Sequence, residues 1–288
     1  MKTSSIPPLN AAAVLKRYGL RADKSLGQNF LQDPFALEKI ANAAEIQEDD
    51  CVLEIGPGLG SLTRYLAVSA RHVTAVELDP DLLGPLKAIL TPHPNVRIVH
   101  GDILDLSIAD LVDRPDYIVA ANIPYNITSA IIRHLLESQP KPRRIVLTIQ
   151  KEVAERICAK PGDLSLLALS VQVYGQPSIA AKIPAGAFHP VPNVDSAILR
   201  IDIYPEPLIP AETLNTFFKL IRAGFSQKRK TLRNSLSSGL HIKPQDTEIL
   251  LSSAEIDPMR RAETLSIEEW KTLCRGYKNS TNSMTGSP

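Results

Sequence analysis

The stretch from Glu54 to Asp79 carries the residue types of a nucleotide-like binding site. Residues 54–60 read Glu-Ile-Gly-Pro-Gly-Leu-Gly. Glycines at alternate positions let the backbone turn tightly and approach a ligand closely. A helix beginning near Ser61 would aim its N-terminal amides at that ligand. The end of the next predicted strand carries Glu77, and a carboxylate there in a doubly wound sheet is placed to meet a ribose diol.

Three details favour S-adenosylmethionine over NAD as the cofactor. The glycine spacing is GxGxG, through Gly56 and Gly58, rather than GxGxxG. Glu54 precedes the first glycine by two positions, where it can meet a cationic amino-acid end. A third predicted strand is followed by Gly101-Asp102, placed to read an adenine edge. The absence of a GK[ST] sequence after the glycines excludes a phosphate-binding P-loop.

A second motif, Asn122-Ile123-Pro124-Tyr125, follows the fourth predicted strand. The lone pair of an adenine N6 amine is delocalised into the ring, so the amine is a poor nucleophile. The side-chain oxygen of Asn122 and a backbone carbonyl near Pro124 can accept both N–H groups and favour a pyramidal nitrogen. Tyr125 offers a face on which a flipped base can stack. Alone, the four residues fit a plain turn equally well, and the glycine motif before them favours the catalytic interpretation. Because a sulfonium is already a good leaving group, methyl transfer at this motif needs no metal ion.

Alternating strands and helices must position these motifs. Predicted strands lie at residues 51–55, 72–78, 96–99, 117–121 and 144–150, and residues 34–44 and 129–137 have helical spacing. This alternation predicts an α/β fold with a doubly wound, mostly parallel sheet of the class I methyltransferase type. Later runs at residues 179–184 and 194–204 favour an edge hairpin.

A proline-rich stretch at residues 205–210 marks the predicted domain boundary, because proline interrupts both helices and strands. We expect a catalytic domain at residues 1–205, with an N-terminal arm at 1–24. We expect a small helical RNA-binding domain at residues 206–288, with a frayed Ser/Thr/Asn-rich tail after Lys278.

The predicted RNA surface lies between Thr213 and Leu240, a stretch with no acidic residue. Phosphate contact is the better interpretation of such a run, although a solvated helix face is the usual one. The residues predicted to bind RNA are Arg222, Lys228, Arg229, Lys230 and Arg233.

The overall composition places limits on the function. The formal net charge of +1 means that any nucleic-acid surface must be local. Three widely spaced cysteines show no metal-ligand spacing and suit a reducing compartment. No signal peptide is evident, and no apolar run approaches the roughly 20 residues of a membrane span. These features predict a soluble, cytoplasmic protein with no bound metal.

The motifs together resemble the family of ribosomal RNA adenine N6,N6-dimethyltransferases over nearly the whole chain. The resemblance rests on the glycine and Asn-Ile-Pro-Tyr motifs and on Lys24–Leu31, Gln150–Ala154, Phe188–Ser196 and Phe225–Asn234. It implies that Asn29, Leu31, Gly56, Glu77, Asp102 and Asn122 bind S-adenosylmethionine, and that Phe188 lies beside the target base. It also implies a substrate of two adjacent adenines in a small-subunit ribosomal RNA hairpin, each methylated twice, in a pre-30S-type particle.

One departure and several alternatives accompany this interpretation. The stretch Lys160–Ser165 is shorter than is usual in the family, which puts in doubt target positioning at the active-site mouth. A large-subunit adenine methyltransferase of the macrolide-resistance type shares the motifs but generally lacks Lys-Arg-Lys-Thr-Leu-Arg-Asn, present here at residues 228–234. A non-catalytic ribosome-assembly factor and an NAD-dependent dehydrogenase remain as other classes, and a monomer is the default oligomeric state.

Overall fold

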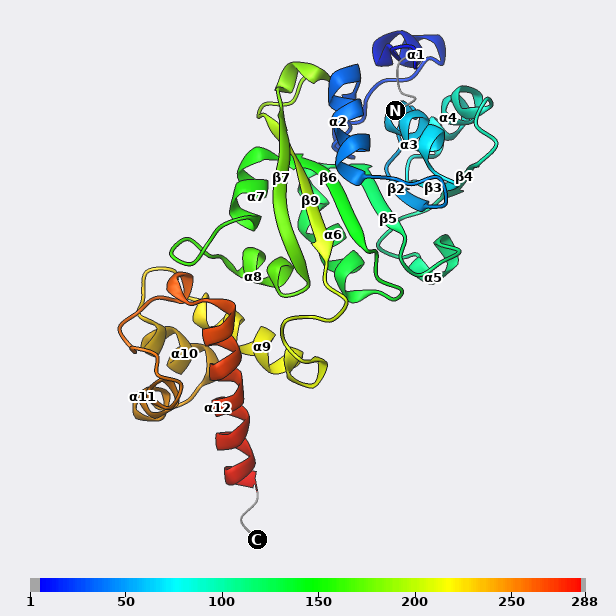
Figure 1. Cartoon of the computed structure of the whole chain (residues 1–288). Coiled ribbons are helices and arrows are strands. Elements are labelled where there is room, and N and C mark those ends of the chain that lie inside the picture. Colours follow the sequence, from blue (N-terminus) through cyan, green and yellow to red (C-terminus); the bar gives the residue numbers. More distant parts are fainter. Residues whose placement is uncertain (1–5, 286–288) are drawn as a thin grey trace. The chain divides into compact units, whose positions relative to one another are not determined.

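The computed structural model describes residues 6–285, and the side chains of residues 6–279. The chain forms two compact units (Figure 1). The first comprises Met1–Glu155 and Gln176–Ile203, and the second comprises Arg156–Gly175 and Tyr204–Pro288. The longer stretch of the second unit starts at Tyr204, and the shorter stretch, Arg156–Gly175, lies within the range 1–205 expected for the catalytic domain and interrupts the first unit in the sequence.

The first unit is built on a seven-stranded sheet with the order β4-β3-β2-β5-β6-β9-β7. Its strands are β2 (Cys51–Ile55), β3 (His72–Glu77), β4 (Val96–His100), β5 (Ile118–Asn122), β6 (Arg144–Gln150), β7 (Gly175–Ile183) and β9 (Ser196–Ile203). The neighbours from β4 to β6 are parallel, and β9 runs antiparallel to β6. The predicted mostly parallel, doubly wound sheet is thus confirmed, and β9 with the edge strand β7 forms its end.

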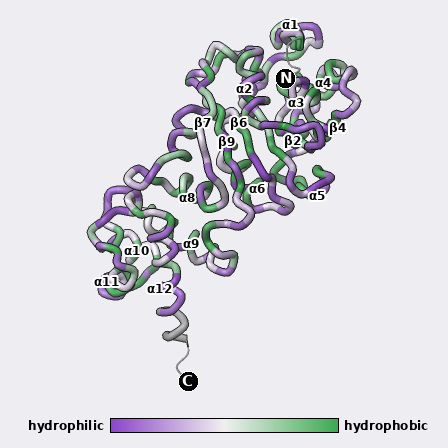
Figure 2. Tube along the Cα trace, viewed as in Figure 1, coloured by the Kyte–Doolittle hydropathy of each residue, from purple (hydrophilic) through white to green (hydrophobic). Residues whose placement is uncertain are grey.

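Both faces of the sheet are covered, as a parallel sheet requires. Ile118 and Ala120 of β5 face a hydrophobic cluster that includes Leu37 and Ile40 of α2 and Leu66 of α3. The alternate residues of β5 point to the opposite face and are also fully buried. The helices around the sheet are α2 (Pro34–Ala44), α3 (Ser61–Ser69), α4 (Leu83–Leu90), α5 (Ile108–Leu111), α6 (Thr128–Glu137) and α7 (Lys151–Ile157). Figure 2 shows hydrophobic residues concentrated along the central strands.

Two smaller features of the first unit lie outside the strand–helix alternation. Helix α1 (Ala11–Arg17) is capped by Asn10, whose side chain accepts a hydrogen bond from the amide of Ala13. Strand β1 (Phe30–Leu31) pairs with β8 (Phe188–His189) in a separate antiparallel ladder. Short 3-10 helices complete the unit: η1 (Pro80–Leu82), η2 (Tyr125–Ile127) and η3 (Ala185–Ala187).

The second unit is helical, as predicted for the C-terminal part of the chain. It contains α8 (Leu166–Gln172), α9 (Ala211–Gly224), α10 (Leu232–Leu240), α11 (Pro244–Ser253), η4 (Ala262–Thr264) and α12 (Ile267–Thr285). The indole of Trp270 is fully buried beside Gly224, where an added Cβ would lie 2.6 Å from the ring. Helix α12 includes residues 279–285, the part of the tail expected to fray, and residues 286–288 lie outside the described residues.

The abbreviated stretch Lys160–Ser165 belongs to the second unit. The amides of Gly162 and Leu164 donate hydrogen bonds to the carbonyl oxygen of Glu263, at 2.9 and 3.2 Å. The stretch is thus tied to η4. Across the described residues, no helix has both the length and the apolar character needed to cross a bilayer.

Candidate functional site

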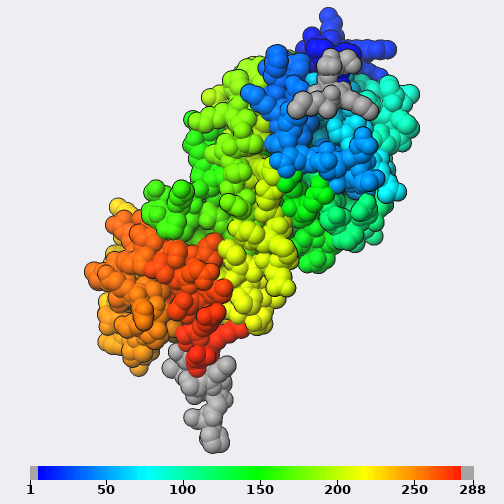
Figure 3. All heavy atoms as spheres, viewed as in Figure 1, coloured from blue at the N-terminus to red at the C-terminus, as the bar shows by residue number. Residues whose placement is uncertain are grey.

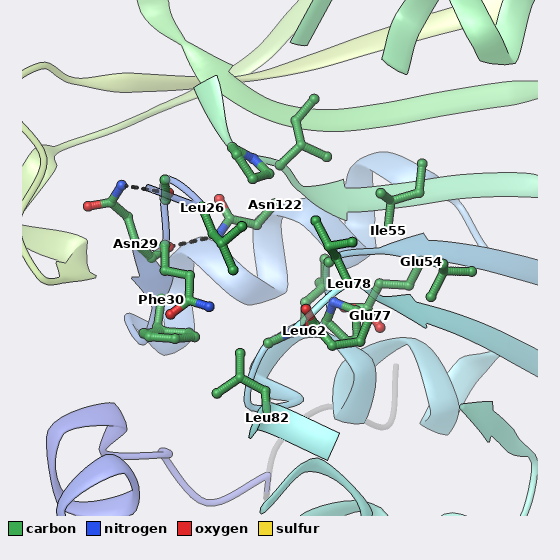
Figure 4. A pocket seen from close by; sticks show the side chains of 18 of the residues that line it. Leu26, Asn29, Phe30, Glu54, Ile55, Leu62, Glu77, Leu78, Leu82 and Asn122 are labelled. Atoms are coloured by element: carbon green, nitrogen blue, oxygen red, sulfur yellow. Dashed lines mark hydrogen bonds between the residues drawn. The ribbon is translucent and has the colours of Figure 1, made fainter. Parts of the chain in front are cut away.

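A pocket lies at the carboxyl ends of β2, β3 and β5 in the first unit. β2 and β5 are adjacent, and the sheet order reverses between them, which is where open α/β sheets bind ligands. Residues after β2 and at the end of β5 both line the pocket. Figure 4 shows side chains from these strands converging with those of the segment before β1.

The glycine motif makes the floor of this pocket. Gly56, Gly58 and Gly60 all have positive φ, at 64°, 58° and 80°, which side chains other than glycine adopt only with strain. A Cβ on Gly58 would also lie 3.0 Å from the ring of Phe30. The turn therefore requires glycine for conformation and for close approach, and α3 begins directly after it, at Ser61.

The carboxylate of Glu77 closes the glycine turn. One oxygen accepts the amide of Gly58 at 2.8 Å, and the other accepts the amide of Asp79 at 2.9 Å. Each carboxylate oxygen has a further lone pair, so both can still accept a hydroxyl. Burial raises the pKa of Glu77, and the two backbone amides act in the opposite direction. Glu77 can thus hold the turn and bind a diol at once.

Glu54 is a buried carboxyl group on the pocket wall. Its side chain is 1% exposed, and its Oε2 has no hydrogen-bond partner among the described residues. Burial raises the pKa of Glu54 to about 8, and the charge of Glu77 adds to that rise. The Oγ of Ser61, also on the wall, is likewise unpartnered within the described part of the chain. Unsatisfied buried polar atoms of this kind fit a ligand that brings its own donors, such as the ammonium group of an amino-acid end.

The Asn122 side chain is held in one orientation. Its Nδ2 donates a hydrogen bond to the carbonyl oxygen of Asn29 at 3.0 Å, and Asn29 in turn donates to the carbonyl oxygen of Gly27 (Figure 4). The Oδ1 of Asn122 is then the acceptor left for a ligand. Gly27 packs against the same turn, since a Cβ added there would lie 3.1 Å from the Cβ of Pro124. The turn after β5 is therefore braced by the segment before β1.

Tyr125 and Phe188 differ in their access to the pocket. Tyr125 lines the pocket, is half-buried, and its hydroxyl lies 2.7 Å from the Oγ of Ser196 at the start of β9. Phe188 is 1% exposed and belongs to the hydrophobic cluster beside α2. In this structure Phe188 is a core residue and cannot stack on a base, so the predicted base contact would require its ring to move.

All eight residues predicted to bind the cofactor line this one pocket: Asn29, Leu31, Glu54, Gly56, Gly58, Glu77, Asp102 and Asn122. One carboxylate oxygen of Asp102 accepts the amide of Leu104 at 2.9 Å. Sequence reasoning missed the apolar lining residues Leu78, Leu82 and Ile103. Two of them could have been found, because Leu78 and Ile103 directly follow the acidic residues Glu77 and Asp102. A flat heterocycle held by Asp102 fits such apolar walls.

The predicted RNA residues lie in the second unit, around the loop between α9 and α10. Lys228, Arg229 and Lys230 are exposed in that loop. Arg222 is also exposed, and its guanidinium lies 5.9 Å from the ring centroid of Phe218. Arg233 differs from the others, because it forms an ion pair with Glu248 at 2.6 Å. The loop cations are thus available to a phosphate backbone, whereas Arg233 is engaged within its own unit.

Comparison with known proteins identifies relatives across nearly the full chain. Proteins named ribosomal RNA small subunit methyltransferase A are 46% identical in Dehalococcoides mccartyi, over 96% of each chain, and 41% identical in Alkaliphilus metalliredigens, over 94% of this chain and 96% of that one.

Solved structures give the same result for the fold. The 23S rRNA methyltransferase ErmE matches with a TM-score of 0.69 and 32% identity, covering 87% of this chain and 100% of its own. A dimethyladenosine transferase from Plasmodium falciparum matches with a TM-score of 0.75 and 25% identity, covering 88% of this chain and 98% of its own.

The sequence profile of the family described as ribosomal RNA adenine dimethylase matches residues 19–278. The chain therefore belongs to this family of S-adenosylmethionine-dependent RNA methyltransferases.

Proposed function

We propose that this chain methylates the N6 amines of two adjacent adenines in a small-subunit ribosomal RNA hairpin and converts each to N6,N6-dimethyladenosine. The observation that supports this chemistry most directly is the anchored Asn122 side chain, whose free oxygen borders the same pocket as the glycine turn. The names of the relatives, which match over almost their whole length, support the small-subunit substrate.

The pocket residues fit the methyl donor. Glu77 would take the ribose hydroxyls, Asp102 the adenine edge, and the unpartnered Oε2 of Glu54 the ammonium group. The donor supplies a methyl group on a sulfonium, which is already a good leaving group. The protein's own contribution is therefore to bind, orient and desolvate the two reactants.

The turn after β5 would prepare the acceptor nitrogen. The Oδ1 of Asn122 would accept a hydrogen bond from one N6 N–H group, and the carbonyl oxygen of Pro124 would accept a hydrogen bond from the other. That carbonyl already lies 3.4 Å from the hydroxyl of Thr128, and it keeps a second lone pair. Both interactions strengthen as positive charge develops on N6, so they act on the rate more than on ground-state binding.

The ring of Tyr125 would carry the flipped base. Its hydroxyl is fixed by Ser196, so the ring is presented in one orientation. Stacking of a base on such a ring contributes about 1–3 kcal/mol. Because Phe188 is buried, Tyr125 is the aromatic residue of the predicted set that borders the pocket.

Two further parts of the proposal concern partners and place. The loop Lys228–Lys230 would contact RNA phosphates. We propose that the substrate is a pre-30S-type particle, which a monomer of this chain methylates in the cytoplasm. The small-subunit substrate in the names of the relatives supports the choice of particle.

The alternative substrate is large-subunit RNA, and the similarity to ErmE favours it specifically. Incubation of unmodified small and large ribosomal subunits with a radiolabelled methyl donor separates the two. We expect label in the small-subunit RNA. Label in the large-subunit RNA alone would support the alternative, and label in neither RNA would favour a non-catalytic assembly factor.

A further inference from the structure

The charge of the first unit is distributed unevenly along its sequence. The unit has 21 acidic and 18 basic residues, a net charge of −3. No acidic residue precedes Asp23, whereas Lys16, Arg17 and Arg21 all lie before it. A polyanion is therefore repelled by the unit as a whole and attracted by its N-terminal part.

We use the term N-terminal basic segment for Lys16, Arg17, Arg21 and Lys24. All four side chains are exposed, and none has an ion-pair partner in the part of the chain that the structure describes. The neighbouring carboxylate of Asp23 is engaged by Ser25, whose amide and hydroxyl both donate to it at 2.7 Å. Figure 3 shows the dark blue N-terminal residues at the surface of the first unit. The charges of the segment are thus open to a ligand.

The segment is also fixed relative to the pocket. Ala11 and Leu15 form the buried face of α1 and pack in one cluster with Phe30, Leu59 and Leu82. Phe30, Leu59 and Leu82 also line the pocket. Helix α1 is therefore anchored on the pocket wall rather than held on a free arm.

Lys24 lies close to the turn that would receive the target base. The amide of Gly27 donates to the carbonyl oxygen of Lys24 at 3.1 Å, which closes a turn and keeps the two Cα atoms within about 7 Å. Gly27 itself abuts Pro124, since a Cβ there would lie 3.1 Å from the Cβ of that proline. An RNA strand that places an adenine at this turn carries its adjacent phosphates past Lys24.

We propose that the N-terminal basic segment is a second RNA-contacting surface, which binds backbone phosphates beside the target adenine and is separate from the loop Lys228–Lys230. This proposal rests on the proposed function, because it takes RNA as the substrate. Exposed lysine and arginine side chains bind phosphate without reading the sequence, so the segment contributes affinity and positioning.

The test compares two charge-matched double variants. Arg17→Gln with Arg21→Gln removes two charges from the segment. Arg71→Gln with Arg114→Gln removes two exposed charges at the amino ends of β3 and β5, opposite the pocket edge of the sheet. Binding to unmodified small ribosomal subunits is measured over a series of salt concentrations. Affinity for S-adenosylmethionine is measured in parallel.

For the segment variant we expect the slope of log affinity against log salt to be shallower by about 1.4–1.8, the sum for two phosphate contacts. The control variant should keep the wild-type slope, and both should keep wild-type donor affinity. Equal slopes in the two variants overturn the proposal while RNA methylation by the wild type leaves the proposed function standing. Failure of the wild type to bind or methylate the small subunits instead contradicts the proposed function.

Because Arg17 lies in α1, the double variant could also disturb that helix, so a single substitution outside α1 serves as a second test. Lys24→Gln removes one charge at the turn, and its slope should be shallower by about 0.7–0.9. If Lys24→Gln leaves the slope unchanged, or if the segment variant weakens donor binding as much as RNA binding, the segment is structural and the proposal is wrong.

Discussion

The side-chain amide of Asn122 donates to the backbone carbonyl oxygen of Asn29, across 3.0 Å and 93 positions of sequence. The bond joins the end of β5 to the segment that precedes β1. It also decides which end of the Asn122 amide faces the pocket, because the nitrogen is used and the oxygen is left.

Two substitutions at this position test the role of that oxygen. Asn122→Ala removes the acceptor and should slow single-turnover methylation by about 10²–10³, the usual cost of one preorganised polar contact. Asn122→Asp keeps an acceptor but sets a carboxylate oxygen against the carbonyl of Asn29, so it should also be slow. RNA affinity should stay near the wild-type value in both variants. An Ala variant within a few-fold of the wild-type rate would mean that the turn is only structural.

Substitution of Glu77 should weaken donor binding. Glu77→Ala removes the proposed hydroxyl contacts, worth about 1.5–3 kcal/mol each for a charged acceptor. It also frees the amides of Gly58 and Asp79, so the glycine turn should loosen. Glu77→Gln keeps one acceptor and should lie between the two. Titration calorimetry measures the affinities, and an unchanged value for the Ala variant would contradict the assigned pose.

The buried carboxyl of Glu54 predicts a pH-dependent stability of the free protein. Its pKa is raised from an ordinary value near 4.5 to about 8, so the folded state favours the neutral form. The stability that this provides is complete below pH 4.5 and is lost as the pH rises through 8. Relative to Glu54→Gln, the wild type should lose on the order of 1 kcal/mol per pH unit at most between pH 5.5 and 7.5. Denaturant unfolding measures the free energy of unfolding of both proteins at each pH. If the two free energies change equally with pH over this range, Glu54 is already ionised in the folded state.

Donor binding should show the opposite pH dependence. An ammonium group pairs with ionised Glu54, so binding below pH 8 should release a proton and strengthen as the pH rises from 6 to 7.5. Calorimetry in two buffers of different ionisation enthalpy counts the released protons. Glu54→Gln is the reference, because it leaves the donor's own titration in place. Equal proton release by both proteins would show that Glu54 does not pair with the ammonium group of the donor.

The loop Lys228–Lys230 should contribute salt-dependent RNA affinity. Replacing its three cations by Gln should lower the salt slope by about 0.7–0.9 for each phosphate that the loop no longer binds. Arg233→Gln should instead lower the stability of the second unit by about 1 kcal/mol at most, because the ion pair of Arg233 with Glu248 is partly exposed. Salt titrations and thermal unfolding of the two variants separate the effects. A triple variant with the wild-type slope would make the loop a solvated surface.

The sequence predicted the parallel strands well because their apolar runs are long and bounded by turn residues. Helix α2 matches the predicted bounds of 34–44, since Asp33 caps it before Pro34 and its apolar spacing is regular. Pairing of β1 with β8 could not be predicted, because two-residue strands have no periodicity and their partners are distant in the sequence.

The site residues that lie in short motifs at the ends of predicted strands could be predicted from the sequence. The glycines follow β2, and Glu77 and Asn122 end β3 and β5, so parallel topology brings all of them to one edge. The role of Phe188 rested on the resemblance of its proline-rich setting to the family's loop beside the target base, whereas its ring lies in the hydrophobic cluster beside α2. Residues 156–175 belong to the second unit, and part of this segment is held by hydrogen bonds to η4. No sequence pattern within the segment indicates these distant contacts.

The central claim is dimethylation of two adjacent adenines in small-subunit RNA. It is tested most directly by mass spectrometry of nuclease fragments from unmodified small subunits treated with the protein and S-adenosylmethionine. We predict a single fragment in which both of two neighbouring adenines gain two methyl groups on N6. In the time that the wild type needs to complete this reaction, Asn122→Ala should produce almost none of it. Methylation of one adenine only, of another atom, or to an equal extent by the Asn122 variant would contradict the account.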